Sequence, residues 1–523
     1  MKTDETLQEN RQHSFLLIYI LVLGLVVRIA AVMLGDFPLN DGGFFYSMSM
    51  DLLNNRFLLP VYTTYNQVSI PFAYPPFGLY LSALFLKIGI PITKTLQFVP
   101  ALVSTVTIWA VYRLGFKMLN SRFQALLSAA VFASTPLAFI WRIFGGGITR
   151  SFGFLFLLLY LSALFSLFKN EGRRAGAVIW GSLTILSHPE AASNMVLAAI
   201  IFFLFLPDKK KMFQSLPILS LGIGLITSIW WVPVIYNHGI NPFLSVIENT
   251  TGISGLRILL SYLGTAEALF LIFSLMGLLF CLFGRDYLLP VWTIAIFLLL
   301  PRGADQYAVI PLALAFAIFV DRILLPGFIQ ALNNQLEKSQ KTLDLGLMDY
   351  LRNRYALIVL FVVVFSLFMV GYRNNLLSNY HSLSVSERQA MAWVKTNTPQ
   401  TSRFLLLGPP DFTLSPFLEW FPALTLRTSI LAIQGYEWLP GKLFAKHIAE
   451  YRSLQKCLNQ GQACLQEWSS ANDMDFDFII VPVASTDSGM ADDIYLILRK
   501  SLVPSGQFQI VYENESEQIF AKR

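Results

Sequence analysis

An aspartate next to two glycines is the first residue of this chain whose type and setting suggest acid–base chemistry. Asp41 lies in the stretch PLNDGGFFYSMSMDLLNN, residues 38–55, shortly after a long apolar run. A carboxylate here could accept a proton from an attacking hydroxyl group, and the glycines would let the chain turn sharply and let a substrate approach the backbone. The alternative is that Asp41 caps the amphipathic helix that follows. Asp36 and Asp51 lack the neighbouring glycines, and we interpret them as surface charges.

Two arginines have the chemistry to bind a phosphate group. Arg150 follows GGGIT at the start of an apolar run, and Arg302 lies at another apolar boundary, four residues before QYAVIP. The guanidinium group presents a planar fork of donors that matches phosphate oxygens. Backbone N–H groups near Arg150 could add to such an anion site. The alternative for both arginines is that they snorkel to the membrane interface.

The composition is that of a polytopic membrane protein. Of the 523 residues, 55% are hydrophobic and only 13% are charged, which is too apolar for an ordinary soluble protein. The net charge of +6 comes from basic clusters between apolar runs, where they act as topology signals and argue against nucleic-acid binding. The first run, at about 15–34, has spanning length and no small-residue cleavage site after it, so we expect a retained anchor.

The apolar runs and the basic clusters together predict a topology. Runs of spanning length or close to it occur at residues 15–34, 95–114, 123–142, 151–168, 175–206, 213–235, 258–283, 286–300, 306–325 and 355–372. All basic clusters fall on the cytoplasmic side if the segment 74–87 does not cross, and its apolar part is well short of the roughly 20 residues that a span needs. We therefore predict about eleven crossings, a cytoplasmic amino terminus, and a segment 74–87 that lies along the outer interface.

The run at 175–206 carries basic residues at both ends and must therefore cross twice. We expect it to turn near SHPEA, residues 187–191, with limbs too short to reach the outer surface. A recessed turn suggests a water-filled cavity that contains His188 and Glu190, because ionisable groups at membrane depth normally face one. The alternative is that Pro189 only breaks a helix while Glu190 stabilises the start of the next one.

The character of the chain changes at about residue 373, and residues 373–523 are predicted to form a soluble extracytoplasmic α/β domain. SERQAMAWVKTNTP has helical spacing, whereas RFLLLG, FDFIIVPV and FQIVYEN are typical of short strands. Cys457 and Cys464 would meet an oxidising environment and could form a disulfide, although two free thiols stay possible. Their spacing fits no usual zinc pattern.

The first helix, the outer loop with Asp41 and the segment YPPFGLYLSAL resemble the GT-C superfamily of polytopic membrane glycosyltransferases. This superfamily includes protein O-mannosyltransferases, aminoarabinose transferases and oligosaccharyltransferase catalytic subunits. The resemblance is sharpest at residues 40–76, where it implies that Asp41 is the catalytic acid of the first loop and that Tyr46 is the tyrosine that commonly accompanies it. Arg302 with Tyr307 is similar to the Arg or Tyr near the start of a late helix in the superfamily. The resemblance implies inverting transfer from a polyprenyl phosphate or diphosphate on the outer face.

The chain also departs from the superfamily's patterns. Several GT-C families place a second acid after the third crossing, where this chain has GGGIT, so a paired-carboxylate metal site is doubtful unless Glu190 or Glu248 substitutes. The WWDYG motif of oligosaccharyltransferases is absent from the C-terminal part, and GPPDFTLSPFLEWFPALTLRTS stands in that region, so sequon recognition is not supported. Metal dependence is left open.

These observations predict an enzyme of the cell membrane with a transmembrane domain at residues 1–372, an outer loop at 35–94 that carries the catalytic acid, and the domain at 373–523. The predicted activity is sugar transfer from a polyprenyl-phosphate donor to an extracytoplasmic glycan, lipid or protein. A transporter or lipid flippase also places charges and broken helices at membrane depth. A third possibility is a non-catalytic relative that only binds a lipid-linked glycan.

Overall fold

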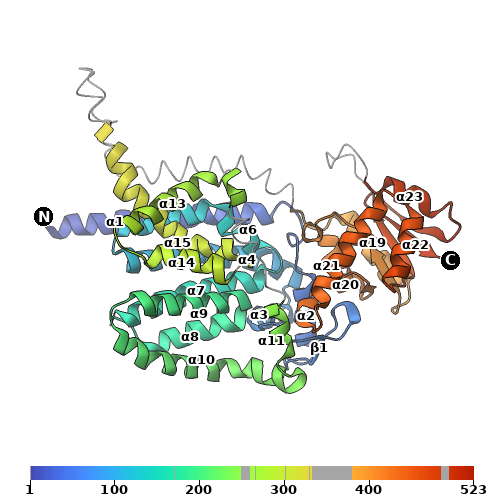
Figure 1. The fold of residues 1–523 in the computed structure, drawn as a ribbon, viewed down its shortest axis with the longest axis horizontal. Helices are drawn as coiled ribbons and strands as arrows, with labels where there is room; N and C mark the ends of the chain where they lie inside the picture. Colours follow the sequence, from blue (N-terminus) through green and yellow to red (C-terminus); the bar gives the residue numbers. More distant parts are fainter. Residues whose placement is uncertain are drawn as a thin grey trace.

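The computed structural model describes residues 2–169, 171–248, 260–264, 267–300, 302–328, 330–331, 380–483 and 494–523. The predicted crossing at 355–372, the predicted domain boundary at 372/373 and most of the stretch 326–354 lie outside these residues. Helices fill one end of the molecule and a sheet with its own helices fills the other (Figure 1).

Five helices in the described part of the chain are long and apolar enough to cross a membrane. Their spans are Arg11–Val32 within α1 (Lys2–Val32), α4 (Ile92–Leu119), α7 (Gly147–Phe168), α10 (Lys209–His238) and Ala304–Phe328, which contains α15 (Ala304–Phe319). Shorter apolar helices are α3 (Phe77–Lys87), α9 (Pro189–Phe205), α13 (Ala268–Phe283) and α14 (Leu288–Leu299). The predicted total of about eleven crossings stays a prediction.

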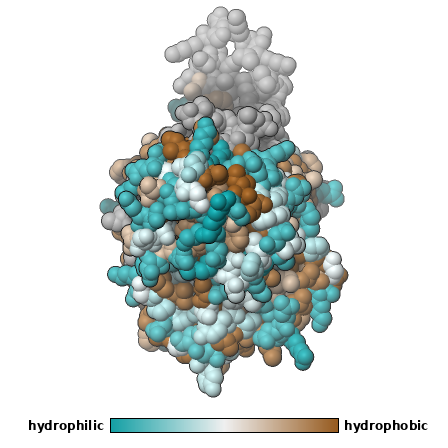
Figure 2. Space-filling view, turned by 90° about the vertical axis from the view of Figure 1, so that its right-hand side faces the viewer, coloured by the Kyte–Doolittle hydropathy of each residue, from teal (hydrophilic) through white to brown (hydrophobic). Residues whose placement is uncertain are grey.

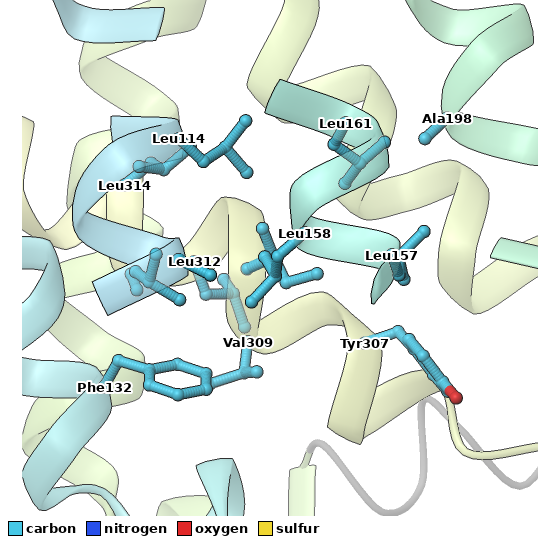
Figure 3. Packing of buried hydrophobic residues seen from close by; sticks show 14 of the residues in the cluster. Leu114, Phe132, Leu157, Leu158, Leu161, Ala198, Tyr307, Val309, Leu312 and Leu314 are labelled. Carbon is cyan, nitrogen blue, oxygen red and sulfur yellow. The ribbon is translucent and has the colours of Figure 1, made fainter. Parts of the chain in front are cut away.

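Helix α7 is the centre of the helical end. Its apolar side chains are nearly all buried, and it packs against α4, α9 and α8 (Arg174–Ser187). Figure 3 shows Leu157, Leu158 and Leu161 of α7 beside leucines of α4 and α15 and Phe132 of α5 (Arg122–Ser134). Because apolar side chains surround α7, the polar groups at its N-terminus are held on a rigid element.

Helix α10 lies at the edge of the bundle and presents an apolar surface. Leu221, Leu225 and Ile229 are each about two-thirds exposed, at 67%, 65% and 69%. In water such a surface would be costly, whereas in a bilayer these side chains contact lipid. The packing of α10 therefore agrees with a membrane protein.

The segment 175–206 forms two helices that turn back on each other, as the sequence predicts. Helix α8 ends at Ser187, His188 adopts an extended conformation, and Pro189 opens α9. Proline is well suited to the first position of a helix, because an N–H group at that position would have no partner within the helix. The turn thus places His188 and Glu190 at the same end of two packed helices.

The C-terminal part contains a mixed five-stranded sheet in the order β4-β3-β5-β7-β6. Its strands are β3 (Arg403–Leu406), β4 (Thr428–Ser429), β5 (Phe478–Pro482), β6 (Phe508–Glu513) and β7 (Glu517–Lys522). β3 pairs in parallel with β4 and β5, whereas β7 is antiparallel to β5 and β6. The helices around it are α19 (Val385–Asn397), α20 (Pro416–Thr425), α21 (Leu443–Leu454), α22 (Gln462–Ala471) and α23 (Leu496–Leu502). The described residues of this part thus contain both helices and a sheet, while the separate α/β domain at residues 373–523 stays a prediction.

The face at this end of the molecule is largely hydrophilic, with scattered apolar patches (Figure 2). Cys457 and Cys464 are joined by a disulfide, and Cys281 is a buried free cysteine of α13. A polar surface and a disulfide suit an aqueous, oxidising compartment. The extracytoplasmic location of this part stays a prediction.

The loop after α1 lies between the helical end and the sheet. It contains α2 (Gly43–Asn54), a small hairpin of β1 (Tyr62–Thr63) and β2 (Ile70–Pro71), and the 11-residue helix α3 (Figure 1). Helix α3 is far shorter than the roughly 20 residues of a spanning helix. Its length supports the prediction that segment 74–87 does not cross.

The structure corrects the interpretation of one of the two flanking aspartates. Asp36 is exposed and pairs with Arg388, as a surface charge would. Asp51 is only 6% exposed, and its carboxylate accepts hydrogen bonds from the Thr63 hydroxyl at 2.7 Å and from the Thr64 N–H at 2.9 Å. The β1 strand folds back over α2 and buries Asp51, so this carboxylate is a structural anchor of the loop.

Candidate active site

Asp41 faces the N-terminus of α7 and not the helix that follows it. Its Oδ1 accepts a hydrogen bond of 2.8 Å from the Gly146 N–H, and its Oδ2 forms an ion pair with Nη2 of Arg150. The N-cap residue of α2 is Gly42, and no side chain of the α2 segment caps the helix. The capping alternative is therefore wrong, and the Asp41 carboxylate is directed toward a cation on a membrane helix.

The triple glycine at 145–147 lets Asp41 come this close. A Cβ atom on Gly145 would lie 2.0 Å from the backbone carbonyl oxygen of Asp41, which no structure tolerates without a backbone shift. A Cβ atom on Gly146 would lie 2.5 Å from Nη2 of Arg150 and 2.9 Å from Oδ2 of Asp41. The GGG sequence thus makes room for the ion pair.

The glycines after Asp41 admit protein and not substrate, which corrects the prediction from sequence. Gly42 has φ of 138°, and a Cβ atom there would lie 2.7 Å from the Trp420 ring. A Cβ atom on Gly43 would lie 2.5 Å from the carbonyl oxygen of Glu419. Since both contacts are with α20, the sharp turn accommodates the C-terminal part of the chain.

Arg150 is buried, and both of its terminal nitrogens have a hydrogen-bond partner. Besides Asp41, it donates a hydrogen bond of 2.8 Å from Nη1 to the carbonyl oxygen of Trp141, and its guanidinium group lies 4.1 Å from the centre of the Trp141 ring. A desolvated cation over an aromatic face is stabilised by the ring quadrupole. Arg150 is therefore held in one orientation with its charge directed at Asp41.

A second ion pair lies on the other side of the same site. Nε of Arg302 is 3.1 Å from Oε1 of Glu190, and the Arg302 side chain is 44% exposed. His188 and Tyr307 approach each other to 3.4 Å between Nδ1 and the hydroxyl group. Tyr307 itself is buried in the apolar core of the helical end (Figure 3), and its ring centre lies 5.7 Å from that of Phe154.

These groups surround one cavity of about 270 Å³ at the junction of the two ends of the molecule. Five of the seven residues predicted from sequence line it: Asp41, Arg150, His188, Glu190 and Arg302. Tyr307 is not among the lining residues, but its hydroxyl group contacts His188, which lines the cavity. Tyr46 points elsewhere and packs on Trp420, with ring centres 5.9 Å apart. Glu248, at the end of α11 (Asn241–Glu248), is exposed and is not among the lining residues.

Sequence reasoning missed three ionisable side chains of the cavity. Tyr74 lines it, and its hydroxyl group is 3.2 Å from Oγ1 of Thr149; burial raises the pKa of Tyr74. Glu419 and Glu437 line it from the C-terminal part. Burial, together with the nearby Asp41 carboxylate, raises the pKa of Glu419 to about 8, and burial also raises the pKa of Glu437. Glu419 lies in the segment GPPDFTLSPFLEWFPALTLRTS, residues 408–429.

The donor set does not fit a divalent metal ion. Each oxygen of Asp41 already has a partner: one accepts a hydrogen bond from the Gly146 N–H, and the other is paired with Arg150. The Arg150 cation would compete with a metal ion for this carboxylate. Oε1 of Glu419 accepts backbone N–H groups of the loop. Within the described ranges, no group of three His, Cys, Asp or Glu residues could hold a metal ion.

Comparisons with known proteins agree on the fold. The archaeal oligosaccharyltransferase AglB from Archaeoglobus fulgidus, in complex with an inhibitory peptide and a dolichol-phosphate, is similar with a TM-score of 0.56 at 14% identity over 91% of this chain and 70% of that one. ArnT from Cupriavidus metallidurans, bound to undecaprenyl phosphate, is similar with a TM-score of 0.57 at 13% identity over 96% and 97% of the two chains. The arabinofuranosyltransferase AftD from Mycobacteria gives 0.55 at 13% identity, over 96% of this chain and 40% of its own length.

Sequence comparisons add less. The family described as 6-pyruvoyl-tetrahydropterin synthase related domain, membrane protein, matches residues 73–249. No curated protein sequence matches the chain. The chain is thus a membrane protein that has the fold of the GT-C glycosyltransferases, as its first outer loop predicts.

Proposed function

We propose that this protein is an integral membrane glycosyltransferase that moves a sugar from a polyprenyl-phosphate donor to an extracytoplasmic acceptor. The observation that carries the proposal is the cavity in which a carboxylate, Asp41, lies with two arginines, Arg150 and Arg302. A base for the acceptor and cations for the leaving phosphate are the groups that such a transfer requires. The fold shared with AglB, ArnT and AftD supports the same class of reaction.

In this proposal Asp41 is the general base. The acceptor oxygen forms a bond to the anomeric carbon while the bond from that carbon to the phosphate oxygen breaks, and the acceptor's proton passes to Asp41. Attack from the face opposite the phosphate inverts the anomeric centre. Arg150 holds the carboxylate in one orientation through their ion pair.

Arg302 is the residue that we assign to the donor phosphate. Its side chain is 44% exposed, and its ion-pair partner among the described residues is Glu190, so an arriving phosphate can take over that contact. It lies directly before the spanning segment Ala304–Phe328, where a polyprenyl chain could enter the bilayer beside it. The prediction that Arg150 also contacts the phosphate stays open, since its donors already serve Asp41 and Trp141.

The two walls of the cavity differ in the side chains that they contribute, and this difference concerns the acceptor. Both arginines belong to the membrane part, whereas the C-terminal wall contributes two acids together with aromatic, hydroxyl and amide groups: Phe412, Thr413, Ser415, Glu419, Gln434, Glu437 and Phe444. Among the described lining residues of this wall none is basic. Such a wall suits an acceptor with neutral hydroxyl groups better than one with a phosphate group.

Binding of undecaprenyl phosphate to the purified full-length protein tests the assignment of the donor site. A charge-assisted hydrogen bond is worth about 1.5–3 kcal/mol, so Arg302→Ala should weaken binding roughly 10–100-fold. Arg302→Lys should lose part of the affinity, because lysine keeps the charge without the fork. Arg285→Ala removes the same charge from an exposed turn outside the cavity and serves as the control.

Two results would contradict the proposal. Equal affinity of the parent and of Arg302→Ala would remove Arg302 from the donor site. Directional release of the bound lipid phosphate across a vesicle membrane, without any transfer of sugar, would favour a flippase.

A further inference from the structure

The start of α2 is capped by a side chain from the far end of the sequence. Oε1 of Glu419 accepts hydrogen bonds from the Gly42 N–H at 3.0 Å and from the Phe44 N–H at 3.4 Å. The first N–H groups of a helix have no partner within the helix, and an N-cap side chain normally supplies one. Here the supplier is on α20, 377 residues further along the chain than Gly42.

The same turn of α20 holds the loop at two further points. Nε1 of Trp420 donates a hydrogen bond of 3.0 Å to the carbonyl oxygen of Asn40, and the Tyr65 hydroxyl donates one of 2.8 Å to the carbonyl oxygen of Glu419. Glu419 and Trp420 are 4% and 0% exposed. The residues on either side of Asp41 are thus fixed by α20, while Asp41 itself is fixed by α7.

We propose that Glu419 is a positioning residue of the active site, which caps α2 in place of Asp41 and so leaves the Asp41 carboxylate to Arg150 and the cavity. An aspartate carboxylate is a good acceptor for the N–H groups at a helix start, and Asp41 lies one residue before the N-cap Gly42, so without Glu419 its side chain would compete for the same N–H groups. The C-terminal part is then a component of the catalytic machinery. This inference rests on the proposed function, because it assigns Glu419 a role in presenting the general base.

The charges around Glu419 fit this role. The groups that face it are Asp41, Arg150 and the Tyr65 hydroxyl. Burial and the Asp41 carboxylate raise its pKa to about 8, which favours the neutral form of Glu419, and a neutral carboxyl group still accepts the N–H groups through its carbonyl oxygen. A second negative charge next to Asp41 is thereby avoided, and it appears only as the pH rises past that value.

Hydrogen exchange of the full-length protein in lipid nanodiscs tests the capping. Loss of an N-cap costs about 0.5–2 kcal/mol, so Glu419→Ala should speed amide exchange at residues 42–46 by roughly 2–30-fold. Glu419→Gln keeps an oxygen acceptor of the same reach and should preserve the parental exchange. Glu517→Ala removes another buried carboxyl group of the C-terminal part, on β7, and should leave exchange at residues 42–46 unchanged.

Activity separates positioning from a purely structural role. Glu419→Ala should lower kcat with little change in donor affinity. We expect the rate of the parent to decline above about pH 8, and Glu419→Gln should keep kcat without that decline. Parental exchange in Glu419→Ala, or equal loss of kcat in both Glu419 variants, would overturn the inference. Undecaprenyl-phosphate binding that ignores Arg302→Ala would instead refute the proposed function and leave the exchange result standing.

Discussion

Substituting Gly146 by alanine should damage the site more than the fold. The added Cβ atom would lie 2.5 Å from Nη2 of Arg150, 2.6 Å from the Phe45 ring and 2.9 Å from Oδ2 of Asp41. All three neighbours are ends of side chains, which can move without a shift of the backbone. The methyl group therefore enters between the two partners of the ion pair.

The size of the effect follows from these contacts. Inserting a methyl group into a packed interior costs typically about 1–3 kcal/mol, which the protein should survive as a lowered melting temperature. A displacement of about 1 Å in a catalytic group can cost on the order of 10²-fold in rate, and we expect a loss of that order for Gly146→Ala. Gly145→Ala should instead fail mainly in folding, because its Cβ atom meets the Asp41 backbone at 2.0 Å.

Thermal unfolding of detergent-purified protein and a sugar-transfer assay give the two readouts. Gly224→Ala is the matched control, since a Cβ atom on this glycine of α10 would meet nothing within 4 Å. Alanine is favoured over glycine within a helix by about 0.5–1 kcal/mol, so this variant should be at least as stable as the parent and fully active. Parental activity in Gly146→Ala would refute the reasoning, because the ion pair would then be dispensable.

Three further predictions concern the C-terminal part and the topology. The pKa of Glu419 is higher in the folded protein than in the unfolded chain, so folding stability should fall as the pH rises from about 4.5 to 8. In Glu419→Gln the melting temperature should depend less on pH over that interval. Identical curves of melting temperature against pH for the parent and the variant would contradict this. Replacing Cys464 by serine opens the short loop to Cys457 and should cost about 2–3 kcal/mol in denaturant unfolding, whereas an unchanged midpoint would count against it. A cysteine placed at Glu467 should react with an impermeant reagent from outside and one at Lys210 only from inside, and the reverse pattern would overturn the site's assignment to the outer face.

The ion-pair residues of the site could be predicted from the sequence because charges are rare in the apolar part. Asp41, Arg150, Glu190 and Arg302 each lie at the boundary of an apolar run, where the membrane leaves few roles for a charge. The break at His188 was equally visible from the proline after it and from basic residues at both ends of the segment. These are local signals, and the structure brings the residues to one cavity.

The long-range contacts could not be predicted in this way. Glu419 has the local pattern of an ordinary acid in the first turn of a helix, and only the docking of α20 against the loop buries it beside Asp41. Asp51 resembles a surface charge on an amphipathic helix until the β1 strand covers it. Tyr46 has the spacing of a site residue, yet its ring packs against Trp420 of the docked helix α20. In each case the deciding contact comes from a segment that the local sequence does not specify.

Sugar transfer by Asp41→Asn measures the central claim most directly. Because Asp41 does not cap α2, and because asparagine can still accept the Gly146 N–H, the variant should fold. It should lose about 10²–10⁴-fold in rate, since the amide cannot take a proton from the acceptor. Asp36→Asn is the control on the same loop, exposed and outside the cavity, whereas the buried Asp51 is unsuitable.

Mass spectrometry of envelope glycans in a deletion strain, complemented with each variant, detects transfer of any sugar as a change in glycan mass. We predict restored glycan modification with the parent and with Asp36→Asn, and none with Asp41→Asn at equal protein levels. Full modification by Asp41→Asn would contradict the assignment of Asp41 as the catalytic base.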